Sequence, residues 1–133
     1  MDPKYADAWN NKGNALGNLG KYEEAVKCFD KALDIDPNNV NAWNNKGLAL
    51  GNSGKYEEAI KCYDKAIELD PKYADAWYNR ASYKIRIDDI DNGLEDLNKA
   101  VEINKEIIEF AKQDKSFEAI RNDERFRKLV DAE

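Results

Sequence analysis

The order of apolar and polar residues at the start of the chain predicts two amphipathic helices. Trp9 and Leu16 recur at helical spacing before Gly20 interrupts the first pattern. The second pattern ends at Pro37, because proline cannot continue a helical hydrogen-bond ladder. Its apolar stripe is formed by Tyr22, Ala25, Val26, Phe29, Ala32 and Leu33. Two helices joined by a tight turn form a hairpin, whose close approach needs small residues such as Gly13.

The hairpin pattern recurs with a period of 34 residues. The period is marked by three tryptophans: Trp9, Trp43 and Trp77. The first two copies, residues 6–39 and 40–73, are identical at 23 of 34 positions, and a third copy, 74–107, diverges but keeps the register. Self-similarity at this length is typical of a stacked array, in which each unit buries its apolar face only against its neighbours.

The repeated residues resemble those of the tetratricopeptide repeat (TPR) family. In the first copy the resemblance is carried by Trp9, Gly13, Leu16, Ala25, Phe29, Ala32 and Pro37. The second copy repeats it with Trp43, Gly47, Leu50, Ala59, Tyr63, Ala66 and Pro71. The third copy departs from the pattern at Ala81, Lys84, Gly93 and Lys105. The resemblance implies an all-α fold, a right-handed superhelical solenoid of antiparallel helix pairs.

We expect one TPR domain over residues 1–133, with repeats at 6–39, 40–73 and 74–107 and capping helices at 108–133. Because Lys105 replaces the proline, the third hairpin is free to continue into residues 106–113. Residues 114–130 then predict two short helices, the second with Asn122 as its N-cap. The apolar residues of this tail are Phe117, Ile120, Phe126, Leu129 and Val130. We interpret the tail as a cap that shields the last hairpin from water.

The chain begins with residues that elsewhere close a repeat. Asp2-Pro3 matches Asp36-Pro37 and Asp70-Pro71. Two interpretations stay open at this stage. The sequence is a piece of a longer array, or the outer face of the first hairpin meets another molecule, including a second copy of the chain in a homo-oligomer.

Composition and charge limit the binding partners and the cellular location that we expect. The net charge of −6 argues against a nucleic-acid partner, which favours a basic surface. No apolar run approaches the length of a membrane span, and the N-terminus does not resemble a signal peptide. We therefore expect a cytoplasmic protein that binds neither membrane nor nucleic acid.

The sequence offers little for catalysis. It has no histidine, the commonest general base near neutral pH and the commonest transition-metal ligand. Cys28 and Cys62 occupy equivalent positions of successive hairpins, beyond disulfide reach, and we interpret them as packing residues. We predict that the protein is not an enzyme and uses no cofactor or metal.

Asparagine dominates the stripe of each first helix that lies opposite the packed side. We predict that this stripe lines a concave groove and binds a peptide. The candidate residues are Asn10, Asn11, Asn14, Asn18, Asn44, Asn45, Asn52, Tyr78, Asn79 and Arg86.

Two interpretations of these asparagines remain. An Asn amide offers a donor and an acceptor, so amides at a constant rise suit the backbone of an extended peptide. Asn11, Asn45 and Asn79 recur at one position, which resembles the asparagine ladder of some peptide-binding TPR proteins. Alternatively, the asparagines are solvated residues copied with the repeat.

The carboxylate clamp of chaperone-binding TPR proteins is matched only in part. Asn14 and Asn45 fit its two asparagine positions. Its lysine positions hold Asn10 and Asp75, and its arginine position holds Asn79. Asp75 would repel a C-terminal carboxylate, so we do not expect this activity.

We therefore predict a non-enzymatic interaction scaffold that binds an extended peptide segment in its concave groove. The alternative is a structural or self-associating segment of a longer array, which stacks through its uncapped N-terminal hairpin. The two hypotheses differ in stoichiometry, because only self-association makes the measured mass depend on concentration.

Overall fold

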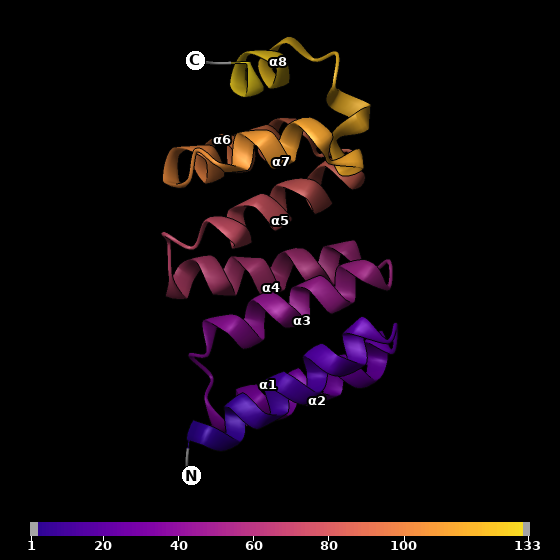
Figure 1. Ribbon diagram of the computed structural model, residues 1–133, viewed down its shortest axis with the longest axis vertical. Coiled ribbons are helices and arrows are strands. Elements are labelled where there is room, and N and C mark those ends of the chain that lie inside the picture. Colours follow the sequence, from indigo (N-terminus) through magenta and orange to yellow (C-terminus); the bar gives the residue numbers. More distant parts are fainter. Residues whose placement is uncertain (1–2, 132–133) are drawn as a thin grey trace. The chain divides into compact units, whose positions relative to one another are not determined.

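A computed structural model describes residues 3–131 of the chain, with side chains from residue 5 onwards. Asp2, which the sequence places at a repeat end, lies outside the described residues. Every regular element of the described part is helical (Figure 1), which confirms the predicted all-α fold. The chain forms two compact units, Met1–Pro71 and Lys72–Glu133.

The first unit consists of two helical hairpins. Its helices are α1 (Pro3–Asn18), α2 (Tyr22–Ile35), α3 (Val40–Asn52) and α4 (Tyr56–Leu69). The turns within the hairpins contain Gly20 and Gly54, whose φ angles of 79° and 88° favour glycine. The hairpins are joined by a hydrogen bond of 2.9 Å, in which Trp43 Nε1 donates to the Pro37 carbonyl.

Close packing inside each hairpin of this unit depends on one missing side chain. A Cβ on Gly13 would lie 2.6 Å from the ring of Phe29, and a Cβ on Gly47 would lie 2.9 Å from the ring of Tyr63. Both rings are buried, at 2% and 0% exposure. The glycines therefore allow each aromatic ring to fill the space between two helices, as the sequence predicted.

The second unit contains the third hairpin and the C-terminal tail. Its elements are α5 (Ala74–Arg86), α6 (Ile90–Ile103), α7 (Ile107–Gln113), a 3₁₀ helix η1 (Lys115–Ile120) and α8 (Glu124–Val130). In the turn between α5 and α6, Asp88 takes the place of Gly20 and Gly54 and keeps the left-handed backbone, with φ of 69°.

The third hairpin does not continue past residue 105, contrary to one expectation from the sequence. Helix α6 ends at Ile103, and Asn104 adopts φ of −142°, close to the values of −138° at Asp36 and −142° at Asp70. The Asn104 side chain accepts a hydrogen bond of 3.1 Å from the backbone N–H of Glu106. Asparagine thus stabilises the same break without a proline.

The third hairpin compensates for its departures from the repeat. Ala81 stands where the other hairpins have glycine, and the facing ring is replaced by the smaller Leu97. Ile85 is larger than the Gly17 and Gly51 at its equivalent positions, and Gly93 faces it. A Cβ on Gly93 would lie 2.6 Å from Ile85 Cγ1.

A buried ion cluster replaces apolar packing elsewhere in the third hairpin. Asp96, at the position equivalent to Cys28 and Cys62, is 4% exposed. It accepts two hydrogen bonds of 2.8 Å from Arg80 and pairs with Lys84 Nζ at 2.9 Å. Lys84 stands where the earlier hairpins have leucine, so the two substitutions fit each other.

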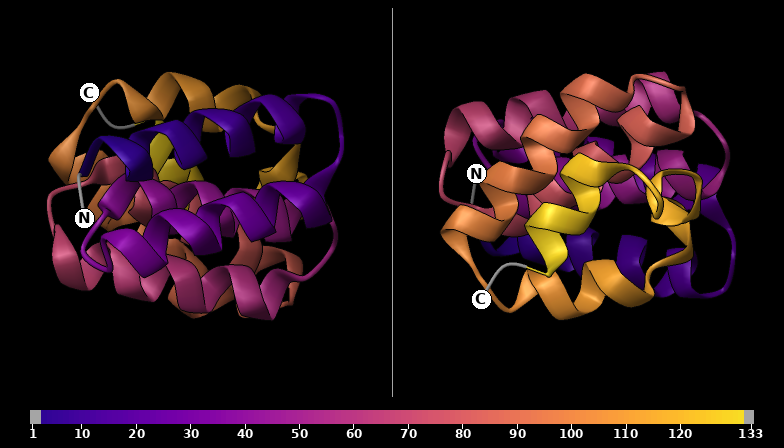
Figure 2. Two further views of the ribbon diagram at one scale, coloured as in Figure 1. Left: turned by 90° about the horizontal axis from the view of Figure 1, so that it is seen from below. Right: turned by 90° about the horizontal axis from the view of Figure 1, so that it is seen from above.

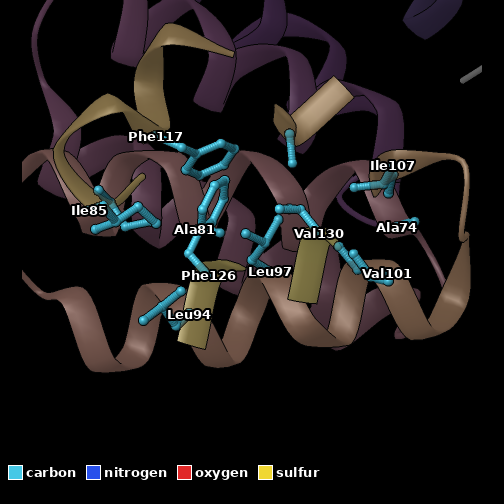
Figure 3. Close-up of a cluster of buried hydrophobic side chains, with 13 residues drawn as sticks. Ala74, Ala81, Ile85, Leu94, Leu97, Val101, Ile107, Phe117, Phe126 and Val130 are labelled. Carbon is cyan, nitrogen blue, oxygen red and sulfur yellow. The ribbon is translucent and has the colours of Figure 1, made fainter. Parts of the chain in front are cut away.

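The tail packs on the third hairpin and completes the core of the second unit (Figure 3). Phe117 of η1 and Phe126 of α8 are buried next to Leu97 of α6, with ring centroids 5.9 Å apart. Figure 2 (right) shows α8, in yellow, lying across this unit. The N-cap of α8 is Asp123, whose side chain accepts a hydrogen bond from the Arg125 N–H, so the prediction of Asn122 was wrong by one residue.

Candidate functional site

The first unit presents amides along the first helix of each hairpin. On α1, Asn11, Asn14 and Asn18 are exposed, and their spacing places them on one helix face. No hydrogen bond within the described part of the chain engages these three amides. On α3, Asn52 is exposed and Asn45 is half-buried. These side chains are free to pair with the backbone of a bound peptide.

Two predicted site residues of this unit are buried in the fold. Asn10 and Asn44, which occupy equivalent positions, are 6% and 7% exposed. Asn10 Nδ2 donates to Asn39 Oδ1 at 3.4 Å, and Asn39 in turn caps α3 by accepting from the N–H of Ala42 at 3.0 Å. Asn10 therefore connects the two hairpins. The prediction that these two amides line an open groove is corrected to a packing role.

The predicted residues of the second unit lie on α5, and two of them hold the tail. The Tyr78 hydroxyl donates to Asp114 Oδ2 at 2.6 Å, and its ring meets Phe117 edge-on at 5.4 Å. Arg86 is exposed, and its Nη2 donates to Ser116 Oγ at 3.1 Å. Asn79 is half-buried, and it already interacts with another group of the protein.

The Tyr78–Asp114 hydrogen bond shifts the pKa values of both groups. Burial raises the pKa of the Tyr78 phenol, and the hydrogen bond to Asp114 raises it further. Burial also raises the pKa of Asp114, but hydrogen bonds from Tyr78 and Ser116 and the charge of Arg86 outweigh it, so the net shift is downwards. The pair therefore stays a phenol and a carboxylate near neutral pH, and it fixes the start of η1 against α5.

A cleft of about 570 Å³ opens beside this pair, between α5 and the start of the tail. It is lined by Asp75, Tyr78, Asn104, Ile107, Glu109, Phe110, Gln113 and Asp114. Phe110 is 69% exposed, unusually high for a large apolar side chain. Carboxylates of Asp75 and Glu109 stand at the edge. The cleft can therefore receive an apolar side chain that has polar or basic neighbours.

Of the residues that line this cleft, the sequence predicted Tyr78 as a binding residue and placed Asp75 at a clamp position on the same groove-facing stripe. Phe110 was missed because the tail was interpreted as a cap alone. A usable signal was present: Ile107 and Ala111 define the buried stripe of α7, and Phe110 falls outside it between Glu109 and Lys112. An exposed aromatic residue at such a position becomes a candidate contact residue when it also lines a cleft, as Phe110 does.

The described part of the chain also bears on metal binding, membrane-spanning helices and free thiols. Residues 3–131 contain no cluster of histidine, cysteine, aspartate and glutamate side chains suited to a metal ion. In the same part, no helix combines the length and hydrophobicity needed to cross a membrane. Cys28 and Cys62 are free thiols buried in the first unit.

The sequence profile of the tetratricopeptide repeat matches residues 6–39 and 40–73, and a second tetratricopeptide profile matches residues 62–95. The first two matches cover more than half of the chain. The chain therefore belongs to the tetratricopeptide repeat family, with about three repeats, which confirms the resemblance seen in the sequence.

Known proteins resemble the chain in sequence over a short segment and in structure over most of its length. An uncharacterized protein of Methanocaldococcus jannaschii is 50% identical over 36 residues, 27% of this chain, and the match spans 42% of that protein's length. The second TPR of Spaghetti (RPAP3), solved with the HSP90 peptide SRMEEVD, has a TM-score of 0.74 and 26% identity, covering 77% of this chain and 94% of that one. YrrB, a TPR protein described as having an unusual peptide-binding site, has a TM-score of 0.71 and 28% identity, covering 79% and 53%.

Proposed function

We propose that the chain is a non-enzymatic interaction module that binds an extended peptide. Its main contact is the cleft beside α5 in the second unit, where Phe110 is exposed and Tyr78 forms part of the wall. The exposed aromatic ring in this cleft is the observation that carries the proposal. Solved TPR structures with bound peptides, such as the second TPR of Spaghetti with SRMEEVD, support it.

The cleft selects its ligand by apolar contact and by charge. Burying an apolar side chain against Phe110 stabilises a complex by about 1.5–3 kcal/mol. Asp75 and Glu109 at the edge favour basic residues beside that side chain. In the first unit, the amides of Asn11, Asn14 and Asn45 offer a separate set of sequence-independent contacts to a peptide backbone.

A displayed library of random peptides, selected on the full chain, tests the proposal. We expect enriched peptides to combine an apolar residue with lysine or arginine. Phe110→Ser should weaken binding of a selected peptide about tenfold or more, as measured by calorimetry. Leu19→Ser is the matched control, because Leu19 is 71% exposed on the first unit and is not among the residues that line the cleft beside α5.

A second variant tests the amides. Changing Asn11 and Asn45 together to alanine should keep the helical circular dichroism and weaken those selected peptides whose binding Phe110→Ser leaves unchanged. Selected peptides that neither Phe110→Ser nor this double variant weakens would overturn the proposed sites.

A further inference from the structure

The first hairpin carries a hollow that repeats, residue by residue, a hollow on the second hairpin. The hollow on the first hairpin, here called the basic face, is lined by Trp9, Lys12, Leu16, Glu24, Lys27, Cys28 and Lys31. A shift of 34 residues turns this set into Trp43, Lys46, Leu50, Glu58, Lys61, Cys62 and Lys65, all of which line the hollow on the second hairpin. The two hollows measure about 310 and 590 Å³, and both belong to the first unit.

On the second hairpin, helix α2 forms one wall of the hollow. Val26 and Asp30, one helical turn apart on α2, both line it. Asp30 Oδ1 pairs with Lys46 Nζ at 2.7 Å, while Lys46 lies 5.7 Å from the centre of the Trp43 ring. Leu50 is 6% exposed under this cover. The second hairpin thus shows which side chains bind in such a hollow: an apolar residue and, one helical turn later, a carboxylate.

The basic face has the same arrangement, but the described residues that line it all come from α1 and α2, with no residue of a third helix among them. Lys12 Nζ lies 5.4 Å from the centre of the Trp9 ring, as Lys46 does from Trp43. No carboxylate among the described residues pairs with Lys12. Leu16, equivalent to the buried Leu50, is only half-buried.

The charge of the basic face points to an acidic occupant. Lys12, Lys27 and Lys31 stand there, and Glu24 is the one acidic residue among the described lining residues, although the whole chain has a net charge of −6. A local excess of lysine on an acidic protein attracts carboxylates at moderate salt.

We propose that the basic face binds an amphipathic helix of a partner protein. That helix carries a small apolar residue and, one turn later, an aspartate or glutamate, the pattern of Val26 and Asp30. The carboxylate pairs with Lys12, and the apolar residue covers Leu16. The site lies in a different unit from the Phe110 cleft and takes a helical ligand in place of an extended one.

A second copy of the chain fits the basic face less well. Two basic faces would set lysines against lysines. On α4 the residues equivalent to Val26 and Asp30 are Ile60 and Asp64, but Asp64 already takes part in an interaction within its own chain. On α6 they are Leu94 and Asn98, and the asparagine lacks the required charge. Leu94 is also 6% exposed in the core that includes α8.

The test uses a synthetic peptide of residues 21–36, the helix that occupies the equivalent hollow, with Cys28→Ser to prevent oxidation. The peptide is titrated into the ¹⁵N-labelled full chain, and the indole N–H signal of Trp9 is followed. We expect saturable shifts at Trp9 that weaken as the salt concentration rises. Lys12→Asp in the protein should weaken binding about tenfold, and Asp30→Lys in the peptide should restore it.

Lys105→Asp is the matched control, because it changes the net charge equally at an exposed position of the second unit. If Lys12→Asp reduces the helical circular dichroism, Lys12→Gln replaces it with a smaller expected loss. The proposal is overturned by absent shifts at Trp9, by failure of the charge exchange to restore binding, or by light scattering that shows a dimer which Lys12→Asp dissociates.

Discussion

At the scale of single residues, each hairpin has one pair of facing side chains that sets how closely its two helices approach. Gly13 faces the ring of Phe29, and Gly47 faces the ring of Tyr63. In the third hairpin Ala81 and Leu97 occupy the equivalent positions. A larger residue on one helix therefore accompanies a smaller one on the other, as close packing requires.

This pairing predicts the outcome of Gly13→Ala. The new Cβ would lie 2.6 Å from Phe29 Cε1, so the ring has to move, and we expect a loss of about 1–3 kcal/mol in the free energy of unfolding. Adding Phe29→Leu copies the Ala81–Leu97 pair and should recover about 1 kcal/mol or more of that loss. A double-mutant cycle by urea denaturation measures the coupling. Purely additive losses would contradict it.

A buried thiol in the first unit links stability to alkaline pH. Burial raises the pKa of Cys62 from 9.0 to about 11, and the nearby charge of Lys46 opposes part of this rise. The thiol is neutral when protonated, so its contribution is complete below pH 9 and is lost as the pH rises through 11.

We therefore expect the free energy of unfolding to fall by about 2 kcal/mol more between pH 9 and pH 11 in the unchanged chain than in Cys62→Ala. The other ionisable groups are common to both proteins, so the difference isolates the thiol. Parallel pH profiles for the two proteins would show that Cys62 does not control this loss.

At the scale of elements, the sequence predicted the helices well where a repeat signal marks them. The turns at Gly20 and Gly54 and the ends near Pro37 and Pro71 follow local rules that the first two copies obey. The prediction failed after Ile103, because Asn104 produces the repeat break by a side-chain hydrogen bond that composition does not reveal.

The ion cluster of the third hairpin was also beyond prediction. Lys84 departs from the family leucine, and the sequence alone does not show that Asp96 lies against it on the neighbouring helix. The structure shows Lys84 Nζ and the Arg80 guanidinium both on the Asp96 carboxylate, which is nearly inaccessible to water. The departure is therefore one half of a paired change between α5 and α6.

The paired change predicts a rescue. Asp96→Cys alone leaves Arg80 and Lys84 without their shared carboxylate, and we expect it to lower the free energy of unfolding by about 3 kcal/mol. Adding Lys84→Leu recreates the leucine–cysteine packing of the first two hairpins and should recover most of the loss. Thermal unfolding followed by circular dichroism compares the variants. A double variant less stable than Asp96→Cys would show that the apolar arrangement does not fit the third hairpin.

At the scale of the whole molecule, the repeat register located the helices but not the burial of each site residue. Asn10 and Asn11 are neighbours on one helix, yet Asn10 is buried at the hairpin contact and Asn11 is exposed. A step of one residue turns a side chain by about 100° around the helix, and small differences in packing decide which side is covered. Phe110 was missed because the tail has no counterpart in the repeat.

The charge of the whole molecule predicts how strongly it binds an acidic peptide such as SRMEEVD. The peptide SRMEEVD carries two glutamates, an aspartate and a terminal carboxylate against one arginine. In this chain the cleft beside α5 is edged by Asp75 and Glu109, and the net charge is −6.

We therefore expect SRMEEVD to bind more weakly than a selected basic peptide, and Asp75→Lys to tighten its binding about tenfold by exchanging a repulsion for an attraction. Fluorescence anisotropy of a labelled peptide at two salt concentrations measures both effects, because raising the salt should weaken the Asp75→Lys complex. Asp34→Lys, at an exposed position of the first unit, is the charge control, because it changes the net charge by the same amount and in the same direction. Tight, salt-insensitive binding of SRMEEVD to the unchanged chain would show that apolar contacts, and not the carboxylates around the cleft, set its ligand preference.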